Sequence, residues 1–329
     1  MEQILRLEAT AEKELTQMDR VLVTGANGFI GNALTLFLSE KEFDVYALER
    51  YVSNRYNVPS NPKVKTVFAD LTDYLAINSL VRQIKPEIII HLAALTAVAT
   101  SYDRWQEYLE TNFNATVNLA ETALRHDPNL KQFVMAGTSE CYGNQDSVSR
   151  LTERAGYCPN SPYAVSKVAA INYLKYMWEA YRFPVTIMLP FNSYGRSNCR
   201  HFIVEHIISQ MLTQKTVRLG DPEPVRDFLY VDDHVEGYFS VLNNKDALGE
   251  TFNLCTGVGT SIRQLAEKTG VLTGYEGEII WNTIPTRPLD IQNLVGDNTK
   301  ATLRLRWEPK VSLDEGLKRT VKLLRNDKH

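Results

Sequence analysis

The chain has 329 residues, of which 44% are hydrophobic and 23% charged, and its formal net charge is −3 at pH 7. This balance is that of an ordinary globular protein, and it gives no basic surface for nucleic acid or an acidic membrane. No segment resembles a membrane-spanning helix, and the first nineteen residues carry too many charges for a signal peptide. The four cysteines are scattered, and the histidines have no ligand spacing. We therefore predict a cytoplasmic protein without a metal site, a nucleic-acid partner or a membrane partner.

Residues 21–31, with the sequence VLVTGANGFIG, predict a buried strand, a glycine-rich turn and the start of a helix. Such a unit presents free backbone N–H groups at a helix N-terminus, where a diphosphate can bind. Gly25 permits the tight turn, Gly28 lets the backbone approach the phosphates, and Gly31 lets the helix pack closely on the strand. Three glycines alone would also suit an ordinary turn, but the strand before and the helix after them favour a dinucleotide site.

Two acidic residues and two alanines at the ends of later strands extend this interpretation. Glu49 ends the next strand-like run, about twenty residues on, where an acid would bond the hydroxyls of a ribose. Asp70 either contacts an adenine or caps the following helix, and capping alone would explain it. The most hydrophobic strand ends in Ala93 and Ala94, whose small side chains suit a backbone lying against a cofactor. Its continuous apolar run is typical of a parallel sheet covered on both faces.

Helix and strand patterns alternate as far as residue 195, which predicts an α/β fold with a Rossmann-type doubly wound parallel sheet. Beyond that point the alternation loosens. We therefore expect an N-terminal extension over 1–19, a dinucleotide-binding Rossmann domain over 20–195 and a smaller substrate domain over 196–329. Segments near 226–255 are expected to return to the Rossmann domain.

Tyr163 and Lys167 lie one turn apart on a helix expected from residue 162 to about residue 182. The reference pKa of tyrosine is about 10, so a tyrosine that acts as a base at neutral pH needs help. A cation one turn away, together with a bound nicotinamide cation, would favour the phenolate. The spacing also arises by chance on ordinary surface helices, and it gains weight from the dinucleotide unit upstream.

Glu140 follows the strand predicted over 132–137, at the end where ligands bind in such sheets. A carboxylate there can remove a proton from a carbon next to a ketone, although most glutamates are simply exposed. Thr138 and Ser139 precede it, and their hydroxyls can donate hydrogen bonds to a sugar oxygen or form a turn.

Taken in chain order, these stretches resemble the extended short-chain dehydrogenase/reductases that act on nucleotide sugars, the NAD-dependent epimerase/dehydratase family. The matching stretches are 24–31, 70–73, 91–94, 138–140, 163–167, 190–195, 226–233 and 287–288. The resemblance implies a retained nicotinamide cofactor and a C-terminal domain that binds the nucleotide. The cofactor contacts that it implies are Gly25, Asn27, Gly28, Phe29, Ile30, Gly31, Glu49, Arg50, Asp70, Leu71, Leu92, Ala93, Ala94, Tyr163, Lys167 and Pro190.

The resemblance also assigns catalytic roles. Tyr163 would take the proton from the 4-hydroxyl of the sugar, and Lys167 would hold the nicotinamide ribose and lower the pKa of Tyr163. Thr138 would hydrogen-bond the 4-oxygen. The substrate ligands that it implies are Asn192, Arg226 and Arg287. The planar guanidinium groups of the two arginines suit a diphosphate.

Glu140 separates the members of this family. Simple 4-epimerases usually carry a short uncharged side chain here, whereas 4,6-dehydratases carry a glutamate that removes the C5 proton before water leaves from C6. The Thr138-Ser139-Glu140 sequence most resembles GDP-mannose 4,6-dehydratases. The dTDP-glucose enzymes carry an aspartate where Ser139 stands, so the acid that protonates the leaving hydroxyl is unassigned, with Glu140 itself or a water as candidates.

Other functions stay open at this point. UDP-glucuronate decarboxylases also resemble Thr138-Ser139-Glu140, and a 4-epimerase with an unusual glutamate comes next. Outside this class of enzymes, the alternative is a sensor that binds a dinucleotide without catalysis. The presence of Thr138, Tyr163 and Lys167 argues against it, because a sensor has no need of these three residues.

Cofactor identity and assembly are two further expectations. Glu49 favours NAD, because its carboxylate would repel the 2′-phosphate of NADP, while Arg50 keeps NADP as the alternative. The helices predicted over 105–125 and 163–182 are expected to pair with their copies in a homodimer, because the second carries more apolar side chains than one sheet face needs.

Overall fold

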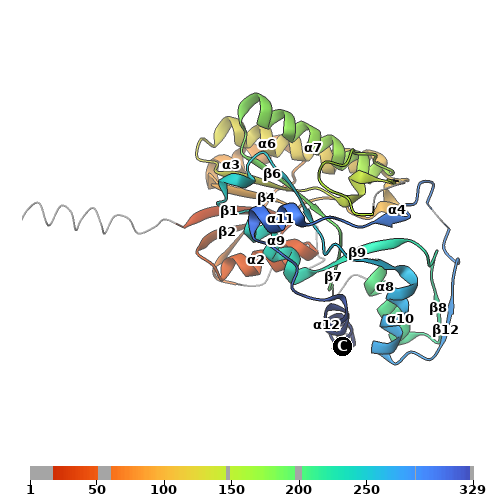
Figure 1. The fold of residues 1–329 in the computed structure, drawn as a ribbon. Helices are drawn as coiled ribbons and strands as arrows, with labels where there is room; N and C mark the ends of the chain where they lie inside the picture. Colours follow the sequence, from red (N-terminus) through yellow and green to blue (C-terminus); the bar gives the residue numbers. More distant parts are fainter. Residues whose placement is uncertain (1–17, 51–60, 146–148, 197–201, 286, 327–329) are drawn as a thin grey trace, which may run out of the picture.

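A large parallel sheet is the centre of the fold. The computed structural model describes residues 18–50, 61–145, 149–196, 202–285 and 287–326, so most of the predicted N-terminal extension lies outside it. Within these residues, seven parallel strands follow the order β10–β6–β5–β4–β1–β2–β3 (Figure 1). They are β1 (Asp19–Thr24), β2 (Phe43–Glu49), β3 (Val64–Phe68), β4 (Ile88–His91), β5 (Gln132–Ala136), β6 (Val185–Pro190) and β10 (Thr251–Leu254).

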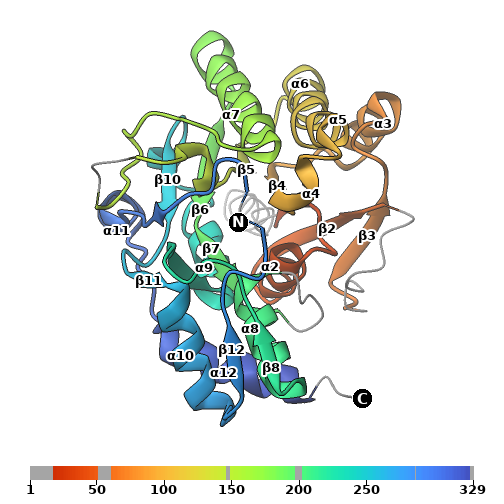
Figure 2. The ribbon, with the colours of Figure 1, turned by 90° about the vertical axis from the view of Figure 1, so that its right-hand side faces the viewer.

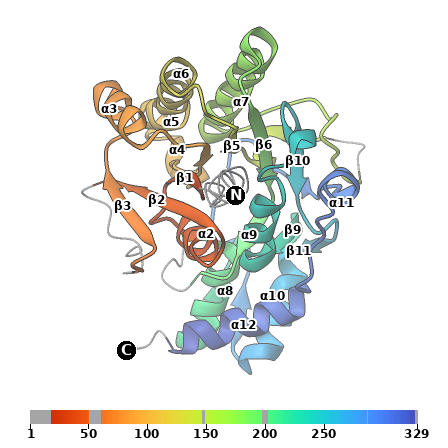
Figure 3. The ribbon, with the colours of Figure 1, turned by 90° about the vertical axis from the view of Figure 1, so that its left-hand side faces the viewer.

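Helices cover both faces of this sheet, as Figures 2 and 3 show from opposite sides. One face carries α3 (Tyr74–Ile84), α6 (Ala115–His126) and α7 (Pro162–Tyr181), and the other carries α2 (Phe29–Ser39) and α9 (Val231–Ser240). Because successive side chains of a strand point to opposite faces, Val21 and Val23 join one core and Leu22 joins the other. The sheet is therefore buried between two apolar layers.

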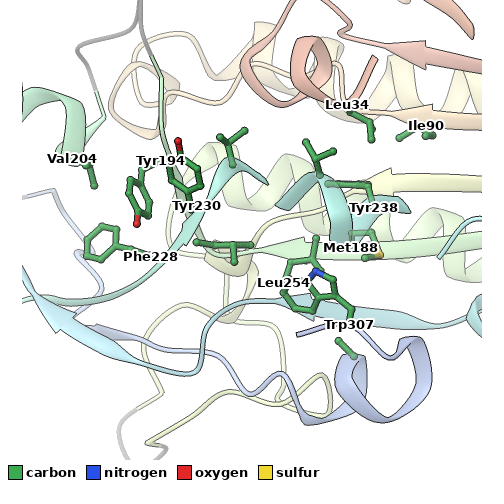
Figure 4. Packing of buried hydrophobic residues seen from close by; sticks show 14 of the residues in the cluster. Leu34, Ile90, Met188, Tyr194, Val204, Phe228, Tyr230, Tyr238, Leu254 and Trp307 are labelled. Atoms are coloured by element: carbon green, nitrogen blue, oxygen red, sulfur yellow. The ribbon is translucent and has the colours of Figure 1, made fainter. Parts of the chain in front are cut away.

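A smaller lobe lies below the α2 face (Figure 1). Its central strand β9 (Val225–Tyr230) pairs with β7 (Asn192–Tyr194), β11 (Gly259–Ser261) and β13 (Asn293–Leu294), and a separate pair joins β8 (Thr216–Arg218) to β12 (Glu278–Ile280). Figure 4 shows one apolar cluster running from Leu34 and Ile90 to Tyr194 and Phe228 of this lobe. The remaining longer helices are α8 (Ile203–Thr213), α10 (Ile262–Thr273), α11 (Thr299–Leu305) and α12 (Leu313–Asn326).

Two local features differ from the sequence expectation. The helix predicted over 105–125 consists of α5 (Trp105–Leu109), a π-helical turn (Glu110–Asn114) and α6. Asn112 in that turn is buried, and its side-chain amide accepts from the N–H of Leu95 and donates to the C=O of Leu95. Asp73, not Asp70, caps α3, because its carboxylate accepts the N–H groups of the first turn.

The shorter helical elements are α4 (Val98–Ser101) and the 3₁₀ turns Ser139–Tyr142 and Lys245–Ala247. None of the helices in the described part of the chain combines the length and apolar character that a membrane span needs.

Candidate active site

The predicted cofactor residues gather where the strand order of the large sheet reverses. β1 lies between β2 and β4, and the chain leaves these strands toward opposite ends of the sheet. In open parallel sheets ligands bind beyond the carboxyl ends of the strands at this point. The glycine turn follows β1, Glu49 ends β2, and Leu92, Ala93 and Ala94 follow β4.

The glycine turn has the geometry that a diphosphate site needs. Gly25 has a φ of +68°, and a Cβ there would lie 2.8 Å from the Cα of Ala93. A Cβ on Gly31 would lie 2.0 Å from the carbonyl oxygen of Gly25, so the turn and α2 are in direct backbone contact. Gly28 precedes α2, and no side chain caps that helix end. The N–H groups of Phe29, Ile30 and Gly31 in the first turn are therefore available to an anion, whereas the N–H of Asn32 bonds the Gly28 carbonyl.

The predicted ribose and adenine ligands flank this turn. The side-chain amide of Asn27 donates to Glu49 over 3.5 Å, and partial burial raises the pKa of the Glu49 carboxyl. Asp70 is exposed and accepts two hydrogen bonds from Thr72, and the nearby Arg50 helps to hold its pKa low. Leu71, next to Asp70, is buried, and Pro190 is the last residue of β6.

His91 is a buried histidine that organises the strand ends. Its two ring nitrogens lie 2.8 Å from the hydroxyls of Thr24 and Thr116, and burial together with Lys167 lowers its pKa to about 3. The Thr24 hydroxyl also accepts the N–H of Ala93. The neutral ring therefore links β1, β4 and α6 behind the glycine turn.

Tyr163 and Lys167 are buried on the first two turns of α7. This helix begins at Pro162, and the Ser161 side chain caps it by accepting a hydrogen bond from the N–H of Ala164. Burial raises the pKa of the Tyr163 phenol above its usual range. A hydrogen bond with the Thr138 hydroxyl lowers the pKa of this phenol, but by less than burial raises it. Burial also lowers the pKa of Lys167 to about 8. The predicted lowering of the Tyr163 pKa by Lys167 stays a prediction for the cofactor-bound protein.

Glu140 lies beside Tyr163, in the 3₁₀ turn that follows β5, and its negative charge contributes to the raised pKa of Tyr163. Its N–H donates to the Thr138 hydroxyl, and Ser139 between them is buried. The Oε2 atom of Glu140 is buried without a hydrogen-bond partner. Burial raises the pKa of this carboxyl, against the opposing effect of Arg287 and Arg226.

Arg226 and Arg287 meet at a residue that the sequence did not single out. Asp290 lies 3.7 Å from the Arg226 guanidinium and 3.3 Å from that of Arg287. Arg226 is only 6% exposed, although 61 positions separate it from Arg287 in the sequence. The carboxylate of Asp290 therefore holds two guanidinium groups together near Glu140.

Two more residues at this end were missed. The Tyr102 phenol donates to the carbonyl of Asn160 over 3.2 Å, and the Asn160 amide donates to the carbonyl of Leu289 over 2.6 Å. The Oδ1 atoms of Asn160 and of the predicted ligand Asn192 are buried without a partner. Tyr102 has no motif that could have revealed it, and Asn160 would have drawn attention only by its position three residues before Tyr163.

The arrangement joins three sets of residues that lie far apart in the sequence. The glycine turn is a candidate anion site, the Thr138–Tyr163–Lys167 set is a candidate proton donor or acceptor, and the arginine pair is a second candidate anion site. Glu140 is in electrostatic contact with both Tyr163 and the arginine pair. Among the residues that the structure describes, no group of His, Cys, Asp and Glu side chains could hold a metal ion.

Comparison with known proteins identifies the family. The family model described as GDP-mannose 4,6 dehydratase matches residues 22–320. The dTDP-glucose 4,6-dehydratase of Haemophilus influenzae is 30% identical, over 93% of this chain and 97% of the relative. The UDP-glucose 4-epimerase of Mycolicibacterium smegmatis is 32% identical, over 93% of this chain and 99% of the relative.

Solved structures agree with this result and confirm the predicted Rossmann-type fold. UDP-glucose 4-epimerase from Thermotoga maritima, solved with UDP-glucose, superposes with a TM-score of 0.86 at 31% identity, over 93% of this chain and 99% of the other. The UDP-glucose 4-epimerase of Thermus thermophilus, solved with NAD, gives 0.84 at 28% identity with the same coverage. The chain therefore belongs to the GDP-mannose 4,6 dehydratase family, among the extended short-chain dehydrogenase/reductases that act on nucleotide sugars.

Proposed function

We propose that this protein is a nucleotide-sugar 4,6-dehydratase that retains NAD. In this reaction the sugar is oxidised at C4, water is eliminated across C5 and C6, and a hydride returns to C6 to give a 4-keto-6-deoxy sugar. Relatives named dTDP-glucose 4,6-dehydratase align over more than nine-tenths of the chain, which supports this reaction class.

The residues at the strand ends suit a dinucleotide. The backbone of the glycine turn would leave no room for side chains at Gly25 and Gly31, and the uncapped end of α2 would bind the diphosphate. Glu49 would bond a ribose, which favours NAD over NADP, while Arg50 beside it keeps NADP as the alternative. Structural neighbours solved with NAD support this choice. NAD, when bound, would accept and later return the hydride.

Tyr163 would remove the proton of the C4 hydroxyl. Its phenol lies against the Thr138 hydroxyl, which would hold the C4 oxygen during the transfer. Lys167 would bind the nicotinamide ribose, and its positive charge would help to stabilise a phenolate. Because burial raises the pKa of Tyr163, this help must come from the charges present in the complex.

The observation that carries the proposal is the environment of Glu140. Its Oε2 atom is buried and unpaired, and burial raises the pKa of its carboxyl, so the carboxylate is a stronger base than an exposed glutamate. The 4-ketone acidifies the neighbouring C5 proton, and Glu140 would remove it. An epimerase that only returns the hydride to C4 needs no base at this position.

The second anion site would bind the nucleotide end of the substrate. Arg226 and Arg287, held by Asp290, would bind the diphosphate, and Asn192 would contact the nucleotide. The Thermotoga maritima neighbour solved with UDP-glucose supports a nucleotide sugar as the class of substrate.

The deciding experiment incubates the protein with a panel of nucleotide sugars and identifies each product by mass and NMR spectroscopy. We expect loss of one water from one of them. In the Glu140→Gln variant, product formation should fall by ~10²–10⁴, the usual worth of general acid–base catalysis, while substrate binding stays near normal. Glu179→Gln, on the exposed end of α7, is the matched control. A Glu140→Gln variant with wild-type turnover would remove Glu140 from the mechanism.

A 4-epimerase is the second candidate, because the Mycolicibacterium smegmatis relative of that name is 32% identical. An isomeric product with unchanged mass would identify it. Loss of carbon dioxide would instead indicate a UDP-glucuronate decarboxylase, and tight NAD binding without any product would indicate a dinucleotide sensor.

We also propose three further expectations from the sequence: a homodimer, a cytoplasmic location, and a division at residue 195 into a Rossmann domain and a substrate domain, with segments near 226–255 returning to the Rossmann domain. The exposed apolar side chains of α7 support the dimer: Val165 is 45%, Tyr176 49% and Tyr181 53% exposed. Light scattering at micromolar concentration tests it, and a monomer would contradict it.

A further inference from the structure

Arg196 is a buried arginine at the junction between the smaller lobe and the glycine turn. It follows β7 and Gly195, whose φ is +114°, and it is only 7% exposed. None of the roles proposed above uses it. A buried guanidinium calls for an explanation, because arginine is almost never fully buried unless it is paired.

Two aromatic rings enclose the guanidinium group. Its central carbon lies 4.2 Å from the centroid of Phe29 and 3.8 Å from the centroid of Phe202. Phe29 is the first residue of α2, directly after Gly28, and Phe202 precedes α8 of the smaller lobe. One side chain therefore bridges the helix end that would bind the diphosphate and the segment that enters α8.

A buried carboxylate fixes Arg196 in this position. Glu205 of α8 is fully buried, lies 3.4 Å from the guanidinium, and also accepts the N–H groups of Gly195 and Arg196 over 2.9 and 3.0 Å. The guanidinium donates in addition to the carbonyl of Ser193 in β7. Because Glu205 pairs with its charge and its backbone N–H, and its Nη1 atom also donates to Ser193, the side chain has little freedom to leave the two rings.

We propose that Arg196 is a positioning residue for the coenzyme: clamped between Phe29 and Phe202, it fixes the first turn of α2 against the smaller lobe. The inference rests on the proposed binding of NAD at that turn. According to this inference, the affinity of the protein for the diphosphate depends on Arg196, which lies between β7 and α8. Arg196 also lies only four positions after Asn192, the predicted nucleotide ligand.

The test removes the clamp without leaving a buried charge alone. The double variant Arg196→Met/Glu205→Gln keeps the volume of both side chains, and its affinities for NAD, ADP and adenosine are measured on the full-length protein by calorimetry and competition. We expect NAD and ADP, which contain the diphosphate, to bind about tenfold more weakly, equivalent to about 1.4 kcal/mol. The affinity for adenosine, which lacks phosphates, should stay unchanged.

The chain offers a matched control. Arg263 lies over the ring of Trp281 at 5.4 Å and pairs with Glu223 at 2.9 Å, but Arg263 and Glu223 are exposed and Trp281 is only partly buried. The variant Arg263→Met/Glu223→Gln should bind NAD, ADP and adenosine as the wild type does. An equal loss in this control would mean that any stacked ion pair has the same effect, which would overturn the proposal.

Each remaining outcome is informative. Unchanged NAD affinity in the folded Arg196 double variant would overturn the proposal, and so would an equal loss for adenosine, which would indicate general loosening. If the double variant fails to fold, Arg196→Lys decides, because it keeps the charge but not the planar stack. It should bind NAD several-fold more weakly, and wild-type affinity would overturn the proposal. A wild-type protein that does not bind NAD would instead refute the proposed function.

Discussion

Replacing Lys167 by methionine should stabilise the protein while it abolishes activity. Lys167 is only 2% exposed, and burial lowers its pKa from the ordinary 10.5 to about 8. Each pKa unit corresponds to about 1.4 kcal/mol, so keeping the ammonium charged inside the fold at pH 7 costs about 3 kcal/mol. Methionine is similar in length and carries no charge, so much of this cost should disappear in Lys167→Met.

The lowered pKa of Lys167 also predicts how the stability difference between the wild type and Lys167→Met changes with pH. Between pH 8 and 10.5 the folded protein releases the Lys167 proton while the unfolded chain still holds it. Stability rises with pH wherever the unfolded state binds more protons, so this group makes the wild type gain stability across that interval. The gain should be absent from Lys167→Met, and the stability difference between the two proteins should therefore shrink above pH 8.

The assay compares melting temperatures by calorimetry at several pH values from 7 to 10.5, on protein stripped of nucleotide. We expect Lys167→Met to melt a few degrees above the wild type at pH 7, with the gap closing as the pH rises. Lys63→Met, at an exposed lysine, is the control and should change neither quantity. The reasoning would be refuted if Lys167→Met melted below the wild type, or if the difference between their melting temperatures stayed constant from pH 7 to 10.5.

Three other substitutions test separate parts of the site. Tyr163→Phe should stop oxidation at C4, so no reduced nicotinamide absorbance should appear with the nucleotide sugar that the wild type converts; its appearance would exclude Tyr163 as the base. Gly31→Ala should lower both the melting temperature and NAD affinity, because its Cβ would lie 2.0 Å from a backbone oxygen of the glycine turn. Gly156→Ala, with no atom within 4 Å of the new Cβ, should change neither, and equal effects would contradict this account. Asp290→Asn should raise KM more than it lowers kcat, because the carboxylate that gathers the arginine pair is lost; an unchanged KM would separate that pair from substrate binding.

Local patterns predicted the parallel sheet, and they singled out residues that the sheet brings together at the carboxyl ends of its strands. The glycine spacing that starts at Gly25, the small residues after β4 and the acid that ends β2 are each encoded within a few positions, and the strand order then brings them together. The Tyr163 and Lys167 pair was equally accessible, since both lie on one face of a single helix.

Features that depend on distant segments were not predicted. Asp290 acquires its place only when the loop before β13 reaches β9, so its sequence context resembles that of any exposed aspartate. Asp73 rather than Asp70 caps α3 because the chain makes a tight turn between them, which the two equivalent acids did not reveal. The clamp around Arg196 joins three elements, and no pattern in its own neighbourhood indicates it.

The edge strand β10 has a consequence for how this protein can be divided. It pairs with β6 along four registered positions, yet the chain reaches it only after passing through β7, α8 and β9 of the other lobe. In a fragment that stops at residue 195, β6 would become an edge strand with unpaired N–H and C=O groups, which can pair with a strand of another molecule. Truncation at this point should therefore give aggregates, and the nucleotide-binding half cannot be isolated by a single cut.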